Sequence, residues 1–358
     1  MILSPGFPEN EEDTTCLSHL QTFIRAIQRA RPDLTLIILT FQYPFFSKEY
    51  LWNGIRVISF GNKYNNRALN LFTGLRVWLS LKRLNKGYQI IGLLSFWFGK
   101  CALVGSDFAK KYNYKHYCWV LGQDAKPANK YLKKVKPGSE SLIIVSDFIA
   151  QSLYKNYGIR PLHIIPMGIE PALFNTEDTP RDIDILGVGS LTALKQYTVF
   201  LEVITLLKVK LPGIKAAICG EGPQTELLVS MVKTLGIENN ISFIGSIPHV
   251  EALAIMKKAK ILLHPSNYEG FSTVCMEALY AGAKVISFIK PMAFDIQNWH
   301  IAADKKEMAN IAVNILQDTQ TEYQPGLPYA VYDCAKAITN LFDPKERVAE
   351  MQPAKIAS

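Results

Sequence analysis

HPSNYEGFSTVCMEALYAGAKVI, residues 264–286, places Glu269 and Glu277 eight residues apart across a predicted strand-to-helix junction. The apolar run that leads into it has the length of a strand, and the residues after it have a helical composition that ends at Gly282. Glu269 is therefore expected in the loop and Glu277 about one turn into the helix. The backbone amides of residues 270–273 lie between them, at the positive end of the helix dipole. This arrangement suits an anionic ligand whose far ends carry hydroxyl groups.

A purely structural role for the two glutamates is the alternative, since an acid near a helix start often only complements the dipole. Glu277, however, stands among apolar side chains, where an apolar residue would pack at least as well. Neither Ser272 nor Thr273 is followed three residues on by Glu or Gln, so a capping box does not explain the pair. The apolar surroundings of Glu277 and the missing capping box therefore favour a ligand site.

The composition is that of a globular protein with room for two domains. The chain has 358 residues, of which 49% are hydrophobic and 20% charged, typical of a folded, water-soluble protein. No apolar run approaches the roughly 18 residues of a spanning helix. Met1 is not followed by a basic, signal-like region, and the six cysteines are dispersed without paired spacing. These features predict a cytoplasmic protein with reduced thiols.

The positive charge is concentrated in the first half of the chain. Residues 1–166 carry 22 Lys and Arg against 10 Asp and Glu, whereas the remainder carries 17 against 21. Nucleic acid, an anionic membrane surface or a phosphorylated acceptor are possible partners for such a half. No nucleic-acid signature is present, so no nucleic-acid partner is predicted. The segment Asn65 to Lys86 could lie peripherally on an anionic bilayer; the alternative is a helix that covers a sheet with a solvated basic edge.

Short β-branched or aliphatic runs alternate with helical patterns along nearly the whole chain. In the first half, strands are expected at Leu34 to Thr40, Ile55 to Ser59, Gln89 to Leu94, His116 to Val120, Ser141 to Val145 and His163 to Ile165. In the second half, they are expected at Asp184 to Val188, Lys215 to Cys219, Ile241 to Ile244, Ile261 to His264 and Lys284 to Phe288. This alternation predicts an α/β fold of two doubly wound, Rossmann-like parallel-sheet domains.

The domain joint is expected in the proline- and acid-rich segment 166–180. The predicted domains are residues 1–166 and residues 167–330, facing across a cleft where ligands bind. Residues 331–358 are expected to hold a C-terminal helix that could cross back to the first domain.

Two glycine turns follow strands of the second half. Gly187 and Gly189 form a GxG, but Thr192 stands where a dinucleotide fingerprint has its third glycine, so the pattern argues against an NAD site. Lys195 falls just past the strand end, where it could reach a phosphate or remain a solvated loop lysine. The turn Gly220–Pro223 connects the next strand to a helix that begins with proline.

Asp182 and Asp184 form a DxD, a spacing that can bind a metal ion. Alternate strand residues share a face, but this pair enters its strand at the amino end, away from any expected site. The histidines are scattered. No metal site is predicted.

Three motifs in order, VGSLTALK (188–195), CGEGP (219–223) and HPSNYEGFSTVCMEAL (264–279), resemble the donor domain of family 4 (group 1) retaining glycosyltransferases of GT-B fold. The segment IIVSDFIAQSLYKNYGIRPLHIIPMGIEPALF (143–174) is similar to the same family's interdomain region. The resemblance covers roughly residues 140–290 well and the earlier residues loosely. The two glutamates with their EGF and EAL flanks carry its specificity.

The resemblance implies a role for each motif residue. Glu269 would contact the hydroxyls of the donor sugar and Glu277 the ribose diol, for which a carboxylate is a suitable bidentate acceptor. Lys195 would neutralise the diphosphate, whose charge grows as it leaves. The implied donor-binding residues are Gly189, Ser190, Lys195, Gly220, Glu221, Gly245, Glu269, Gly270, Phe271, Ser272, Thr273 and Glu277, with Lys195 and Glu269 catalytic.

Three departures from the family's pattern stand out. Ser190 replaces an arginine beside the lysine, and the lost charge-assisted hydrogen bond is worth about 1.5–3 kcal/mol. Leu121 stands where the family often has a histidine, and the opening Pro5–Pro8 lacks a glycine pair. Gln123 and Asp124 remain as acceptor-side candidates, although a loop aspartate before a helix is more often an N-cap.

The function implied is a retaining, metal-independent transfer of a sugar from a nucleotide-sugar donor to a saccharide or lipid-linked acceptor, with no separate cofactor. A surface-polysaccharide pathway at the inner membrane face is the setting that the resemblance implies. A non-catalytic binder of nucleotide sugar or of a partner protein is the first alternative, favoured by Ser190 and Leu121. Another GT-B activity, such as an epimerase or an inverting transferase, is the second.

Overall fold

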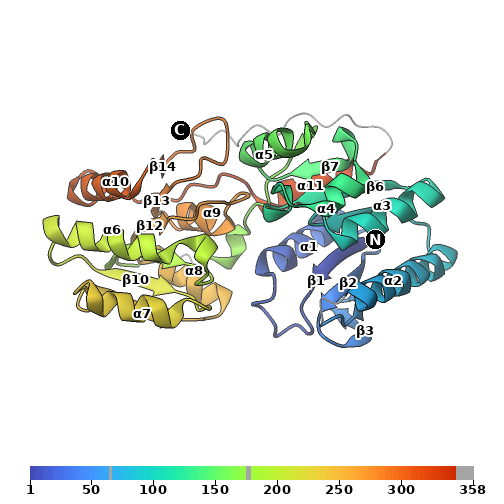
Figure 1. Ribbon diagram of the computed structural model, residues 1–358, viewed down its shortest axis with the longest axis horizontal. Helices are drawn as coiled ribbons and strands as arrows, with labels where there is room; N and C mark the ends of the chain where they lie inside the picture. The colour runs from blue at the N-terminus through green and yellow to red at the C-terminus, as the bar shows by residue number, and fades with distance from the viewer. Residues whose placement is uncertain (64–66, 175–178, 344–358) are drawn as a thin grey trace. The chain divides into compact units, whose positions relative to one another are not determined.

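The computed structural model describes residues 1–63, 67–174 and 179–343. The chain divides into two compact units (Figure 1). The first unit contains Met1–Gly168 and the segment that starts at Val331, and the second contains Ile169–Ala330. Each unit is built on one parallel or mostly parallel sheet, so the predicted pair of doubly wound α/β units is confirmed.

The first unit has an eight-stranded sheet in the order β3-β4-β2-β1-β5-β6-β7-β8. Its strands are β1 (Ile2–Gly6), β2 (Ile37–Tyr43), β3 (Ser47–Trp52), β4 (Ile55–Phe60), β5 (Gly92–Phe96), β6 (Lys115–Val120), β7 (Leu142–Ile144) and β8 (His163–Ile164). Its helices are α1 (Ser18–Ala30), α2 (Arg67–Gly87), α3 (Lys100–Tyr112), α4 (Lys130–Val135), α5 (Asp147–Tyr157) and α11 (Val331–Asn340). All neighbouring strands are parallel except the edge strand β3, which is antiparallel to β4. The order reverses between β1 and β5, so the topological switch point lies there.

Strand β1 is central to the sheet, although no strand is predicted there from the sequence. Ile2 and Leu3 are buried and the strand pairs in parallel with both β2 and β5. Pro5 and Gly6 close it, and this breaks the apolar run that would reveal a strand. The edge strand β3 was missed because most of its residues are exposed, so it carries no apolar run. The observed β2 also begins and ends three residues later than predicted.

The second unit has a fully parallel six-stranded sheet in the order β11-β10-β9-β12-β13-β14. Its strands are β9 (Ile183–Val188), β10 (Ala216–Cys219), β11 (Ile241–Gly245), β12 (Ala259–His264), β13 (Lys284–Ser287) and β14 (Trp299–Ile301). Its helices are α6 (Tyr197–Lys210), α7 (Thr225–Thr234), α8 (His249–Lys257), α9 (Thr273–Tyr280) and α10 (Lys305–Gln317). Numbered from β9, this is the strand order 3-2-1-4-5-6 of a Rossmann fold, with its switch point between β9 and β12.

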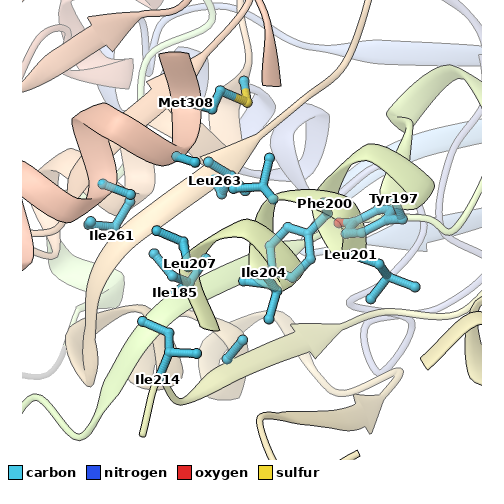
Figure 2. Close-up of a cluster of buried hydrophobic side chains, with 14 of the residues drawn as sticks. Ile185, Tyr197, Phe200, Leu201, Ile204, Leu207, Ile214, Ile261, Leu263 and Met308 are labelled. Atoms are coloured by element: carbon cyan, nitrogen blue, oxygen red, sulfur yellow. The ribbon is translucent and has the colours of Figure 1, made fainter. Parts of the chain in front are cut away.

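The hydrophobic core of the second unit holds the ends of its strands in place. Figure 2 shows Phe200 and Ile204 of α6 packed with Ile185 of β9, all fully buried. Met308 of α10 closes the same cluster. Alternate strand residues such as Leu186 face the other side of the sheet, where α8 and α9 pack against β12. Each fully buried aliphatic or aromatic side chain contributes about 1.5–3 kcal/mol, so the loops at the strand ends start from fixed positions.

The segment after Ala330 returns to the first unit. Helix α11 packs against α1. Arg31 Nη1 donates to both carboxylate oxygens of Asp343, each at a distance of 3.1 Å. Lys115 Nζ donates to the Leu341 carbonyl at 2.9 Å. The part of the predicted C-terminal helix beyond residue 343 lies outside the described residues. Among the described helices, none is both long and apolar enough to cross a bilayer.

Candidate active site

Lys195 and Glu269 meet at the switch point of the second unit. Lys195 ends the short 3-10 segment Ala193–Lys195 that follows β9, and Glu269 lies in the loop after β12. These two strands are neighbours, and their connections leave toward opposite sides of the sheet. Residues at their carboxyl ends therefore converge on the place where open α/β sheets bind ligands.

Lys195 Nζ donates a hydrogen bond to Glu269 Oε1, and His264 Nε2 lies 3.3 Å from the same oxygen. Burial alone would raise the pKa of Glu269, but the His264 hydrogen bond and the Lys195 charge together lower it to about 2. Glu269 is therefore ionised and can only accept hydrogen bonds. Both partners are partly accessible, with side-chain exposures of 23% for Lys195 and 20% for Glu269.

His264 was not singled out in the sequence, although it is the last residue of β12. Its side chain is buried, and burial together with the Lys195 charge lowers its pKa. A neutral imidazole beside an ionised carboxylate must carry its proton on the facing nitrogen, here Nε2. The sequence feature that could have indicated His264 is its position at the end of a strand next to the switch point.

The start of α9 supplies backbone donors beside this pair. Ser272 caps the helix: its hydroxyl accepts from the Cys275 amide at 3.4 Å, and its carbonyl accepts from the Met276 amide at 3.2 Å. The amides of Thr273 and Val274 therefore have no partner within the helix. Phe271, buried in the preceding loop, packs with its ring centroid 5.7 Å from that of Trp299. The donors thus sit on a rigid turn with the positive helix end behind them.

Glu277 lies one turn further into α9, and its carboxylate has a partner that the sequence did not reveal. His249 Nε2, at the start of α8, is 2.7 Å from Glu277 Oε1. Burial opposes the charged form of His249, but the hydrogen bond and the charge of Glu277 raise its pKa above the ordinary value. No sequence motif links residues 249 and 277, because the pair forms only when α8 and α9 pack together.

Three glycine turns close the carboxyl ends of β9, β10 and β11. The Gly220 amide donates to the Gly245 carbonyl at 2.8 Å, and the Gly189 amide donates to the Cys219 carbonyl at 3.0 Å. A Cβ on Gly220, whose φ is +139°, would lie 2.0 Å from the Gly189 carbonyl oxygen. Position 220 therefore requires glycine for close approach, and the three turns form a low rim of half-buried backbone at the strand ends. Ser190 and Glu221 stand on this rim as exposed residues.

The DxD sequence lies at the other end of the sheet. Asp184 accepts from Lys260 Nζ at 2.8 Å and from the Lys215 amide at 2.9 Å, and Asp182 is exposed beside it. Asp184 therefore ties the amino ends of three strand segments together. Its oxygens are engaged in a structural contact.

The acceptor-side candidates belong to the first unit, whereas the Lys195 cluster belongs to the second. The Asp124 carboxylate accepts the amides of Phe98 at 2.7 Å and Gly122 at 2.9 Å. It therefore braces the loops after β5 and β6. Gln123 is exposed next to it.

Known proteins resemble the second unit in sequence. Residues 172–298 match the family described as "Glycosyl transferases group 1". Glycogen synthase of Mycobacterium tuberculosis is 26% identical over 178 residues, which is 48% of this chain and 43% of that protein. The phosphatidylinositol N-acetylglucosaminyltransferase gpi3 subunit of Schizosaccharomyces pombe is 26% identical over 164 residues, which is 44% of this chain and 36% of that protein. The chain thus spans less than half the length of these curated relatives.

Solved structures resemble the whole chain in fold. The Anabaena HepE protein in complex with UDP and glucose aligns with a TM-score of 0.66 at 16% identity, covering 96% of each chain. Sucrose-phosphate synthase from Thermosynechococcus elongatus aligns with a TM-score of 0.68 at 16% identity, covering 96% of this chain and 95% of the other. In its second unit the chain therefore carries the sequence pattern of the group 1 glycosyltransferases, on the GT-B fold of two Rossmann-like units.

Proposed function

We propose that this chain is a retaining, metal-independent glycosyltransferase that moves a sugar from a nucleotide-sugar donor to a saccharide or lipid-linked acceptor. The observation that carries the proposal is the Lys195–Glu269 ion pair at the switch point, next to the start of α9. A cation, a carboxylate and helix amides at one strand edge match a diphosphate that bears a sugar at one end and a nucleoside at the other.

In the proposed complex, the donor diphosphate lies between Lys195 and the amides of Thr273 and Val274. Glu269 accepts hydrogen bonds from the sugar, and Glu277, held by His249, accepts them from the ribose diol. The rim of glycine turns then lets the base approach the backbone. Ligand binding exchanges the Lys195–Glu269 contact for a lysine–phosphate contact, so the ammonium stays compensated throughout.

The proposed reaction needs no nucleophile from the protein. The bond between the anomeric carbon and the phosphate oxygen breaks, and the acceptor oxygen bonds to the same face of the sugar. The leaving phosphate takes the proton of the acceptor hydroxyl. Lys195 and the α9 amides stabilise the negative charge that grows on the leaving group. The lysine ammonium and the amide donors both belong to the protein itself, which is the reason for proposing metal independence.

A cytoplasmic, peripheral location at the inner membrane face is part of the same proposal. It is supported by the excess of Lys and Arg in residues 1–166, because anionic lipid surfaces attract basic segments. Surface-polysaccharide synthesis is the pathway class proposed. One structural neighbour, with a TM-score of 0.61 at 14% identity, is a lipopolysaccharide outer core galactosyltransferase.

Nucleotide release from a panel of UDP-, GDP- and ADP-sugars tests the proposal, in the presence of a chelator and with NMR of the product anomer. Turnover with retained configuration is expected, and Lys195→Ala and Glu269→Ala should each remove most of it. The exposed Lys233→Ala on α7 is the matched control and should keep it. Wild-type turnover in both site variants would overturn the donor assignment, and an inverted anomer would overturn retention.

Ser190 favours a second candidate, a non-catalytic protein that binds nucleotide sugar. Ser190 stands exposed on the rim where the resembling family often has an arginine. A binding protein would show a higher melting temperature with its ligand but release no free nucleotide over long incubation. Release above the rate without protein excludes this candidate.

A further inference from the structure

A groove of about 1240 Å³ opens on the first unit at the carboxyl ends of its central strands. Pro5 of β1, Gln42 of β2 and Phe96 of β5 form part of its lining. This edge contains the switch point of the first sheet, between β1 and β5. The groove therefore occupies the position where this sheet is expected to bind a ligand.

Helix α2 gives the groove an apolar wall. The wall residues share one helix face at spacings of three and four: Leu71, Gly74, Leu75 and Trp78. Leu71 is 72% exposed and Leu75 is 55% exposed, whereas Val77 and Leu81 on the sheet side are fully buried. A surface helix normally buries one apolar stripe and presents polar residues elsewhere. Here a second apolar stripe faces an open groove, with α3 beside it (Figure 1).

Lysines gather in the same groove. Lys100 begins α3, and Lys130 and Lys134 lie on α4, against a single lining carboxylate, Asp107. The pKa of Lys100 is lowered chiefly by burial and also by the positive charge of Lys130. An anionic group bound among these ammonium groups would relieve their mutual repulsion. The groove is thus complementary to a negative charge attached to an apolar body.

Trp97 adds an aromatic surface to the groove. It follows β5 directly, and its φ of +57° puts it in the left-handed region that a bulky residue rarely adopts. Its amide donates to the Trp119 carbonyl at 3.0 Å, which holds this conformation. Backbone strain of this kind clusters at ligand sites, and an indole ring is a suitable platform for a sugar.

We propose that this groove binds the acceptor as an anionic amphiphile, a saccharide carried on a lipid phosphate. The hydrocarbon chain lies along Leu71 and Leu75, the phosphate lies among the lysines, and the sugar lies toward Trp97. That the ligand is an acceptor rests on the proposed transfer function. The binding itself does not, because it follows from groove residues of the first unit alone.

Binding of dodecyl phosphate to the full chain, below its critical micelle concentration, tests the groove by calorimetry. Dodecyl maltoside, which lacks the phosphate, and inorganic phosphate, which lacks the hydrocarbon chain, are the comparison ligands. Each is expected to bind at least about tenfold more weakly, because a tenfold change corresponds to about 1.4 kcal/mol and each lacks one whole contact surface. Equal binding of inorganic phosphate would overturn the proposal in favour of a free-phosphate site.

Matched variants locate the ligand. Leu71→Glu with Leu75→Glu should weaken dodecyl phosphate binding by about tenfold or more. Leu79→Glu is the control, because Leu79 is 54% exposed on the same helix but does not line the groove. Lys134→Gln should weaken binding, and the neighbouring Lys133→Gln, outside the lining, should not. Melting temperatures close to that of the unaltered chain establish that the variants are folded.

The remaining outcomes separate this proposal from its alternatives. Wild-type affinity in the folded leucine double variant would overturn it. Binding only to vesicles of anionic lipid, weakened equally by Leu79→Glu, would replace the groove with a membrane-facing helix surface. If the protein binds nucleotide but no amphiphile, only the proposal for the groove is contradicted. If it binds amphiphile but releases no nucleotide, only the proposed transfer function is contradicted.

Discussion

His249 Nε2 lies 2.7 Å from Glu277 Oε1, so the first residue of α8 holds a carboxylate in the second turn of α9. The side chain of Glu277 is only 9% exposed, and that of His249 is 20% exposed. A carboxylate buried to this extent needs a hydrogen-bond donor to offset its desolvation. The histidine therefore links α8 to α9 and fixes the orientation in which Glu277 would meet the ribose diol of the proposed donor.

Removing this donor should destabilise the protein in a pH-dependent way. His249→Ala should cost about 1–3 kcal/mol of unfolding free energy, because it leaves a buried acceptor unpaired. The folded-state pKa of His249 is raised above 6.5. The charged pair therefore contributes fully below that value, and its contribution is lost as the pH rises through the raised pKa. Urea unfolding of both proteins should show a larger difference at about pH 6 than at about pH 9.

His249→Gln provides the control for this prediction, since an amide can still donate to Glu277 without titrating. It should recover part of the stability lost in His249→Ala and show no histidine-linked pH dependence. It should also bind nucleoside diphosphate better than His249→Ala does. Equal stability differences at both pH values would contradict a charged His249 in the folded state.

Glu269→Gln should impair sugar transfer without weakening the binding of a nucleoside diphosphate. In Glu269→Gln the carboxylate no longer holds Lys195, so the ammonium is more available to phosphate. A nucleoside diphosphate should then bind at least as tightly as to the unaltered protein, while transfer from the nucleotide sugar is largely lost. Calorimetry with the nucleoside diphosphate and a turnover assay measure the two effects. Weaker binding of the diphosphate would indicate that Glu269 contacts the nucleotide portion.

Acid unfolding offers an independent measurement of the same pair. The pKa of Glu269 falls from 4.5 to about 2 in the folded protein. Its ion pair therefore contributes stability above pH 4.5, and this contribution is lost as the pH falls toward about 2. The difference in unfolding free energy between the unaltered protein and Glu269→Gln should shrink across that interval. A constant difference would contradict the depressed pKa.

The sequence predicted that Lys195 and Glu269 come together, as they do in the structure, but it did not reveal every strand or every side-chain pair. Lys195 and Glu269 could be brought together because each follows an apolar strand, and the carboxyl ends of parallel strands share an edge. The central strand β1 was missed because proline and glycine interrupt its pattern. His249 could not be found, since its partner is 28 residues away and the contact depends on helix packing. Local patterns encode strand ends, whereas side-chain pairs between helices arise only in the folded unit.

Restoring a cation beside Lys195 should reveal whether Ser190 limits donor binding. Ser190 is exposed after Gly189, so Ser190→Arg introduces no buried charge. A charge-assisted hydrogen bond to the diphosphate should tighten nucleotide-sugar binding by about tenfold or more. Ser230→Arg, on the exposed face of α7, is the control and should leave the affinity unchanged. No gain from Ser190→Arg would show that position 190 does not reach the diphosphate.

The rim of glycine turns should tolerate no side chain at Gly220. A Cβ there would stand 2.0 Å from the Gly189 carbonyl oxygen, and the φ of +139° is itself unfavourable for alanine. Gly220→Ala must therefore separate the turns after β9 and β10, at a cost of about 1–3 kcal/mol in stability. Gly213→Ala is the matched control, because nothing lies within 4 Å of its Cβ position and its φ is unexceptional. Thermal unfolding should show a lower melting temperature for the first variant and little change for the second. Because Gly189 precedes the loop that carries Lys195, Gly220→Ala should also weaken nucleotide binding. If the variant is destabilised but its nucleotide affinity is unchanged, the glycine turns do not position the proposed diphosphate site.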